Sequence, residues 1–207
     1  HNFAVEIASS RMVCIRSSLL VTSACATSPP AGSFTVTESS YNLGGFLCGN
    51  QETKASIWYP TELADGPFPI VTYGHGMGGQ MIPDLIQSVA SLGMIVVAPA
   101  TSAGKCDDNH WKDMLHAIEG SKAKPSLHTA LGHVDWSKVG IMGHSMGGYA
   151  SLNGAADVAT NPSKYSFSLK AMLDSHGYIG DFDQAAPAIK IPAMFTTGTE
   201  DHASRLK

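Results

Sequence analysis

The sequence is poor in charge and has no excess of basic residues. Only 14% of its 207 residues are charged, against roughly 25% in a typical soluble domain. The charged residues are 13 Lys and Arg and 17 Asp and Glu, which give a formal net charge of −4. Because nothing in this composition neutralises a run of phosphates, we expect no nucleic acid partner.

Two further absences concern membranes and cross-links. No segment approaches the ~18 consecutive apolar residues that a membrane-spanning helix needs, so we expect no membrane span. The four cysteines are too few for a disulfide scaffold. Cys48 and Cys106 would pair in an oxidising compartment or stay two separate thiols, and the sequence leaves both alternatives open.

Residues 1–33 differ from the rest of the chain. They contain two arginines, the apolar run Leu19-Leu20-Val21, and then Ala24-Cys25-Ala26, which has the small-x-small form of a signal-peptidase site. We interpret them as an N-terminal leader, which would make the protein secreted or organellar, or as a disordered tail. Residues 34–207 are interpreted as one domain.

What the sequence does have is an alternation of apolar runs and helix-period segments from about Thr35 onward. The apolar runs predict short buried strands, at 54–60, 69–73, 94–99, 139–142, 169–173 and 191–195. Apolar residues at helical spacing predict helices between them, over 82–92, over 108–119 and from Met146 onward. This order predicts an α/β fold, with a mostly parallel central sheet and helices on both faces.

The strongest motif is Gly143-His144-Ser145-Met146-Gly147, which has the form G-x-S-x-G between a predicted strand and a predicted helix. A serine on such a turn has a strained backbone, and the residues two before and two after it need to lack a Cβ, as Gly143 and Gly147 do. The turn raises the Ser145 hydroxyl above the carboxyl edge of the sheet. It also sets the Met146 amide at a helix N-terminus, where an oxyanion is stabilised.

A second glycine cluster, Tyr73-Gly74-His75-Gly76-Met77-Gly78-Gly79, follows an earlier strand. We predict that the His75 backbone amide is the other oxyanion donor and that the His75 side chain is structural. The cluster also fits the dinucleotide fingerprint G-x-G-x-x-G, but the acidic residue expected about twenty positions later is missing. No nicotinamide or other cofactor is therefore expected, and the histidine spacing is not that of a zinc site.

A serine nucleophile needs a carboxylate and a histidine base, here in the chain order Ser, acid, His. Asp201, in the turn after the strand that begins at 191, is the first choice for the acid. Asp174, at the end of the preceding strand, is the alternative, and Glu200 is a lesser candidate.

The histidine is harder to assign. His202 would have to fold back across its own loop, and His176 follows the alternative acid directly. We therefore expect the base to lie beyond Lys207, with a last strand and helix missing from a C-terminally truncated domain.

These motifs resemble the α/β-hydrolase superfamily, and within it the lidless branch of dienelactone hydrolases, bacterial polyester hydrolases and cutinases, and chlorophyllases. The resemblance extends from about Lys54 to Ala203 and rests on His75-Gly76 and on the segments 90–99, 143–148 and 191–192. It implies Ser145 as nucleophile, the Met146 and His75 amides as oxyanion donors, and Asp201 as acid, as in polyester hydrolases. Chlorophyllases and platelet-activating-factor acetylhydrolases point to Asp174 instead.

The predicted activity is hydrolysis of carboxylic esters through an acyl-enzyme, without a cofactor. The connection of about fifteen residues between Asp174 and Ile191 leaves no room for a large lid, so an open site would admit a small-molecule or polymeric ester. One alternative is a catalytically inactive protein of the same fold that binds a ligand. Another is an esterase that uses Asp174 and acts on phospholipid acetyl groups or chlorophyll. The sequence does not determine the oligomeric state.

Overall fold

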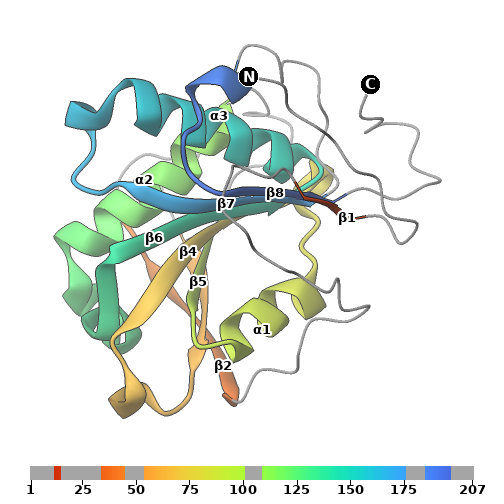
Figure 1. Cartoon of the computed structure of the whole chain (residues 1–207). Helices are drawn as coiled ribbons and strands as arrows, with labels where there is room; N and C mark the ends of the chain where they lie inside the picture. The colour runs from red at the N-terminus through yellow and green to blue at the C-terminus, as the bar shows by residue number, and fades with distance from the viewer. Residues whose placement is uncertain (1–11, 15–33, 45–53, 101–108, 176–184, 197–207) are drawn as a thin grey trace.

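The computed structural model describes residues 12–14, 34–44, 54–100, 109–175 and 185–196 (Figure 1). Within them, eight strands form one sheet in the order β1-β8-β7-β6-β4-β5-β3-β2. The strands are β1 Met12–Cys14, β2 Val36–Asn42, β3 Lys54–Pro60, β4 Phe68–Gly74, β5 Ile95–Pro99, β6 Val134–His144, β7 Leu169–Ser175 and β8 Ala193–Thr196.

The centre of the sheet is parallel and its edges are antiparallel. β5, β4, β6, β7 and β8 run in one direction, which confirms the predicted mostly parallel sheet with the strand at 69–73 in its interior. β3 is antiparallel to β5, and β2 to β3. The connection 61–67 holds only the short turn η1 (Leu63–Asp65), which is too little for the crossover that a parallel return from β3 to β4 would need.

Three helices cover the two faces of the sheet, α1 on one and α2 and α3 on the other (Figure 1). Their bounds are α1 Pro83–Ser91, α2 His110–Ala123 and α3 Met146–Thr160. Each lies where apolar periodicity predicted a helix, and α2 extends to Ala123. The remaining short turns are η2 Met77–Gly79, η4 Pro125–Leu127, η5 Thr129–His133, η6 Pro162–Lys164 and η7 Ala186–Ala188.

Both faces of the sheet are buried, which explains the continuous apolar runs of its strands. In β5, Ile95 and Val97 belong to the core cluster that includes residues of α2 and α3. The residues between and after them, Val96 and Ala98, belong to a second cluster with Ile86 of α1. Side chains of a strand alternate between faces, so one apolar run supplies two cores.

Some predictions fall partly or wholly outside the described residues. Of the segment 1–33 the structure describes only β1, which pairs antiparallel with β8 at one edge of the sheet. Cys48 and Cys106 both lie outside. Within the described ranges, no helix is long and apolar enough to cross a membrane.

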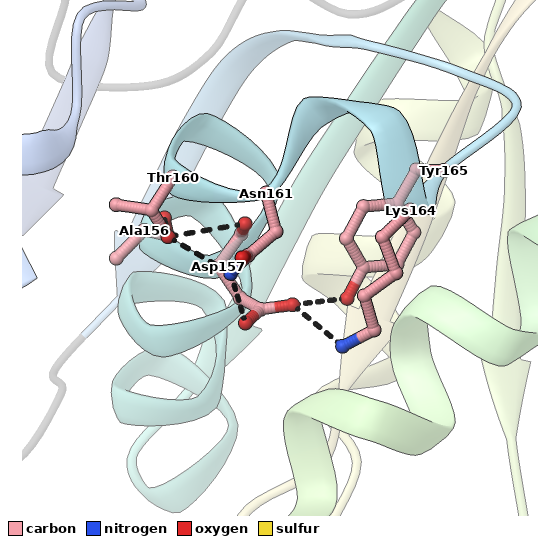
Figure 2. Close-up of polar contacts among 6 residues, drawn as sticks. All are labelled: Ala156, Asp157, Thr160, Asn161, Lys164 and Tyr165. Atoms are coloured by element: carbon pink, nitrogen blue, oxygen red, sulfur yellow. Dashed lines mark hydrogen bonds and ion pairs between the residues drawn. The ribbon is translucent and has the colours of Figure 1, made fainter.

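α3 ends in a hydrogen-bond network around Asp157 (Figure 2). Its carboxylate accepts hydrogen bonds from the Asn161 amide at 3.0 Å, from the Lys164 ammonium at 3.0 Å and from the Tyr165 hydroxyl. Burial acts to raise the pKa of Asp157, but the hydrogen bonds from Tyr165 and Lys164 outweigh it and lower the pKa below its usual value. The network ties the end of α3 to η6, which leads toward β7.

The Asp157→Asn substitution tests this anchor. Asparagine keeps the shape but loses the charge-assisted bonds, so we expect the free energy of unfolding to fall by about 1–2 kcal/mol at pH 7. Because folding lowers the pKa of Asp157, its contribution is present at neutral pH and is lost as the pH falls through the folded-state value. The difference between the two proteins should therefore shrink below pH 3.8, the ordinary pKa of the group.

Urea unfolding at a series of pH values measures this difference. Asp65→Asn, at an exposed carboxylate in η1, is the matched control. Equal losses in the two variants, or a loss for Asp157→Asn that persists in acid, would contradict the role of the network.

Candidate active site

The G-x-S-x-G segment forms the turn from β6 into α3, and its serine is strained. Ser145 has φ 55° and ψ −118°, and no other non-glycine residue in the described ranges has a positive φ. Its N–H donates to the Ser175 carbonyl at 3.0 Å, and its carbonyl accepts from the Tyr149 N–H at 3.1 Å. The backbone is thus held on both sides, while the half-buried side chain makes no capping hydrogen bond to α3.

Glycines allow this turn to lie against its neighbours. A Cβ on Gly143 would overlap with the Gly147 carbonyl, and a Cβ on Gly147 would overlap with the carbonyl of Gly74. A Cβ on Gly74 would in turn lie 2.8 Å from the Gly147 Cα. The predicted need for glycine at 143 and 147 is therefore met, and the steric need at Gly74, which sequence reasoning missed, comes from its contact with α3.

The second glycine cluster lies beside the turn at Ser145. A Cβ on Gly76 would be 3.6 Å from the Ser145 Cβ. The loop turns tightly, since the Gly76 N–H donates to the Gln80 carbonyl at 2.7 Å, and Gly78 and Gly79 have φ of 72° and 82°. As first residue of α3, Met146 has an N–H without a partner inside the helix. These positions are compatible with the predicted oxyanion donors.

The side chain of His75 is buried, with 5% of its surface exposed. Its Nδ1 forms a hydrogen bond of 2.8 Å with the Gly76 carbonyl, so the donating tautomer carries its proton there. Its ring lies against that of His110, with 4.3 Å between ring centroids. These contacts agree with a structural side chain at His75.

His110 is the residue near the site that sequence reasoning missed. It is completely buried at the start of α2, and burial, followed by the neighbouring His75 ring, lowers its pKa to about 3. No local pattern marks this contact, because it forms only when α2 packs against the end of β4.

Asp174 is the one predicted acid or base that lies within the described residues. It is 3% exposed near the carboxyl end of β7, where it pairs with Gly143 of β6 and Phe195 of β8. The next residue, Ser175, accepts the hydrogen bond from the Ser145 backbone. Asp174 thus lies on the strand that is hydrogen-bonded to the turn at Ser145. The other candidates lie outside the described residues, namely Asp201, Glu200, His176 and His202.

No group of three or more His, Cys, Asp or Glu side chains suited to a metal ion occurs within the described residues. The site as described consists of a strained serine, two turns rich in backbone N–H groups, and a buried carboxylate on the neighbouring strand. Such a set can bind and polarise a carbonyl group.

The strain at Ser145 is testable through stability alone. At ordinary positions glycine is less stable than alanine by about 0.5–1 kcal/mol. At φ 55° alanine keeps the strain and glycine relieves it, so we expect Ser145→Gly to be more stable than Ser145→Ala by about 1 kcal/mol.

The same pair of substitutions at Ser126, exposed in η4, provides the reference. There the order should reverse, with alanine more stable than glycine. Thermal or urea unfolding of the four variants measures both differences. If alanine is more stable than glycine at position 145 as well as at position 126, Ser145 stores no strain.

Comparison with known proteins adds to this geometry. The sequence matches the chlorophyllase family over residues 41–190, a stretch that contains Ser145 and Asp174 and ends before Asp201. Over 103 residues it is 31% identical to a bis(hydroxyethyl) terephthalate hydrolase of Streptomyces coelicolor, a match that covers 48% of this chain and 32% of the relative. The chain thus aligns with about a third of the length of that relative. With the family match covering most of its length and the sheet order described above, the chain belongs to the chlorophyllase family of α/β-hydrolases.

Proposed function

We propose that this protein hydrolyses carboxylic esters with Ser145 as the nucleophile. The observation behind the proposal is the backbone of Ser145, held at a positive φ on a strand-to-helix turn. Such strain persists only where the surroundings over-determine it, and it concentrates at functional sites. The Ser145 hydroxyl makes no capping hydrogen bond to α3, so helix capping does not account for a serine at this place.

The reaction follows from the chemistry of an activated serine. The Ser145 Oγ attacks the ester carbonyl carbon, and its proton passes to a histidine base, which we assign to no described residue. The C–O bond to the alcohol breaks as the alcohol takes up that proton, which leaves an acyl-enzyme. Water then attacks the acyl carbon and gives a proton to the same base. The base passes this proton to the Ser145 Oγ as the C–O bond of the acyl-enzyme breaks and the carboxylic acid leaves.

The oxyanion of each tetrahedral intermediate needs donors that are already in position. We assign the backbone amides of Met146 and His75 to this role. Met146 begins α3, a helix of 15 residues, so its N–H lies at the positive end of the helix dipole. Gly76, next to His75, lies close to Ser145, which brings the second loop within reach of the same oxygen.

Two carboxylates compete for the role of the acid that orients the base. Burial of Asp174 near the carboxyl end of β7 and membership of the chlorophyllase family favour Asp174. Asp201 stays the alternative, as the resemblance to polyester hydrolases implies. The substrate class we propose is an ester of a bulky acid or alcohol, and the terephthalate ester named for the relative is a suitable first substrate.

Reaction with a fluorophosphonate tests the nucleophile directly. Only an activated serine reacts quickly with this reagent, so protein that contains the histidine base should give one adduct by intact mass, and its Ser145→Ala variant should give none. Wild-type protein unfolded before the reaction is the second control and should give no adduct. If residues 1–207 fold but form no adduct, two explanations are left, a base that lies beyond Lys207 and the ligand-binding alternative. An adduct that survives in Ser145→Ala would mean another nucleophile.

Separate substitutions distinguish the two acids. If Asp174 is the acid, Asp174→Asn should lower kcat on a terephthalate ester by roughly 10³–10⁴-fold, whereas Asp201→Asn should leave kcat within a few-fold of wild type. Circular dichroism and unfolding of both variants check that each is folded. The reverse pattern would assign the role to Asp201, and two small effects would exclude both.

A further inference from the structure

The first two turns of α2 lie against the root of the loop that borders the nucleophile. His110 and Met114 are four residues apart and therefore share one face of this helix. The His110 ring contacts the ring of His75, and the Met114 sulfur lies 2.8 Å from where a Cβ on Gly74 would be. One face of α2 thus lies against Gly74 and His75, the two residues directly before Gly76.

The two histidines are in direct ring contact, in a tilted arrangement. The rings are tilted by 44°, and His110 is wholly buried. Neither nitrogen of His110 has a hydrogen-bond partner in the part of the chain that the structure describes, and the same holds for the Nε2 of His75. Since burial lowers its pKa to about 3, His110 is neutral at physiological pH and its ring packs as an uncharged aromatic group.

A buried polar ring without a hydrogen bond to the protein costs more free energy than an apolar side chain of similar size. Stability alone therefore does not account for a histidine at this position. His110 contacts His75, whose Nδ1 is hydrogen-bonded to the Gly76 carbonyl, and Gly76 lies next to Ser145. The chain of contacts thus runs from α2 through His110, His75 and Gly76 to the nucleophile.

We propose that His110 is a positioning residue, whose ring holds His75 and thereby fixes the loop 74–79 beside Ser145. This inference deepens the proposed function, on which it rests for its catalytic consequence. The role follows from ring contact, so another aromatic side chain should replace histidine while a small one should not. Geometry at an oxyanion site matters strongly, since displacements of about 1 Å cost up to roughly 10²-fold in rate.

Hydrogen–deuterium exchange of the peptides that cover 74–80 tests the positioning without relying on activity. We expect His110→Ala to exchange at least tenfold faster in this loop than wild type, and His110→Phe to exchange like wild type. His116→Ala, which removes the same side chain from the same helix away from the loop, is the matched control and should leave the loop unchanged. If His110→Ala fails to fold, His110→Leu takes its place. Exchange of the loop in His110→Leu that equals the exchange in His110→Phe would overturn the proposal, because leucine has no ring.

The second measurement separates kcat from KM on a terephthalate ester. A positioning role predicts that His110→Ala loses roughly 10–100-fold in kcat with KM within about twofold, that His110→Phe recovers most of the loss, and that His116→Ala loses little. Unchanged loop exchange in His110→Ala, or equal effects of His110→Ala and His116→Ala, would overturn the inference. Wild-type chain that hydrolyses no ester and forms no phosphonate adduct would count against the proposed function, while loop exchange still decides the positioning role.

Discussion

The site depends on one close approach, in which the first turn of α3 lies directly on the backbone at the end of β4. Gly147 and Gly74 meet there without side chains between them, and Gly143 meets the same turn from β6. The Gly147 carbonyl also accepts a hydrogen bond from the Ser151 hydroxyl at 2.8 Å, which stiffens the helix start. Because these backbones touch, a shift of the turn at Ser145 would displace the loop that begins at Gly74.

The parallel strands at the centre of the sheet connect these glycines to residues of β7 and β8. Gly74 pairs with Gly143, Gly143 with Asp174, and Asp174 with Phe195, so one row of residues crosses four neighbouring strands at the same level. Parallel strands bring their carboxyl ends to one edge, where the loops that follow them converge. The row therefore explains why a buried carboxylate on β7 belongs to the same place as the serine after β6, although 29 residues of chain separate them.

Much of this arrangement is readable from local sequence. Six of the eight described strands, the helices α1 to α3 and the turn at Ser145 follow from patterns within about ten neighbouring residues. Buried strands are apolar on both faces, and the turn at Ser145 needs glycine on either side. The edge strands β1 and β2 were not predicted. The antiparallel placement of β3, the steric need at Gly74 and the contact of His75 with His110 are not readable in this way. Each of these features depends on a contact between segments that are far apart in the sequence, so no local pattern predicts it.

Backbone strain and several buried polar atoms without a hydrogen bond lie near the end of β4. Ser145 has its unusual φ there, and within the described residues the buried Thr72 hydroxyl and both His110 nitrogens have no hydrogen-bond partner. By contrast, Asp157 at the far end of α3 has several donors. Each buried group without a partner costs roughly 1–3 kcal/mol, so this small region opposes folding and the two apolar cores offset it. Costs of this kind are typical of functional sites, and the strained turn at Ser145 lies next to these groups.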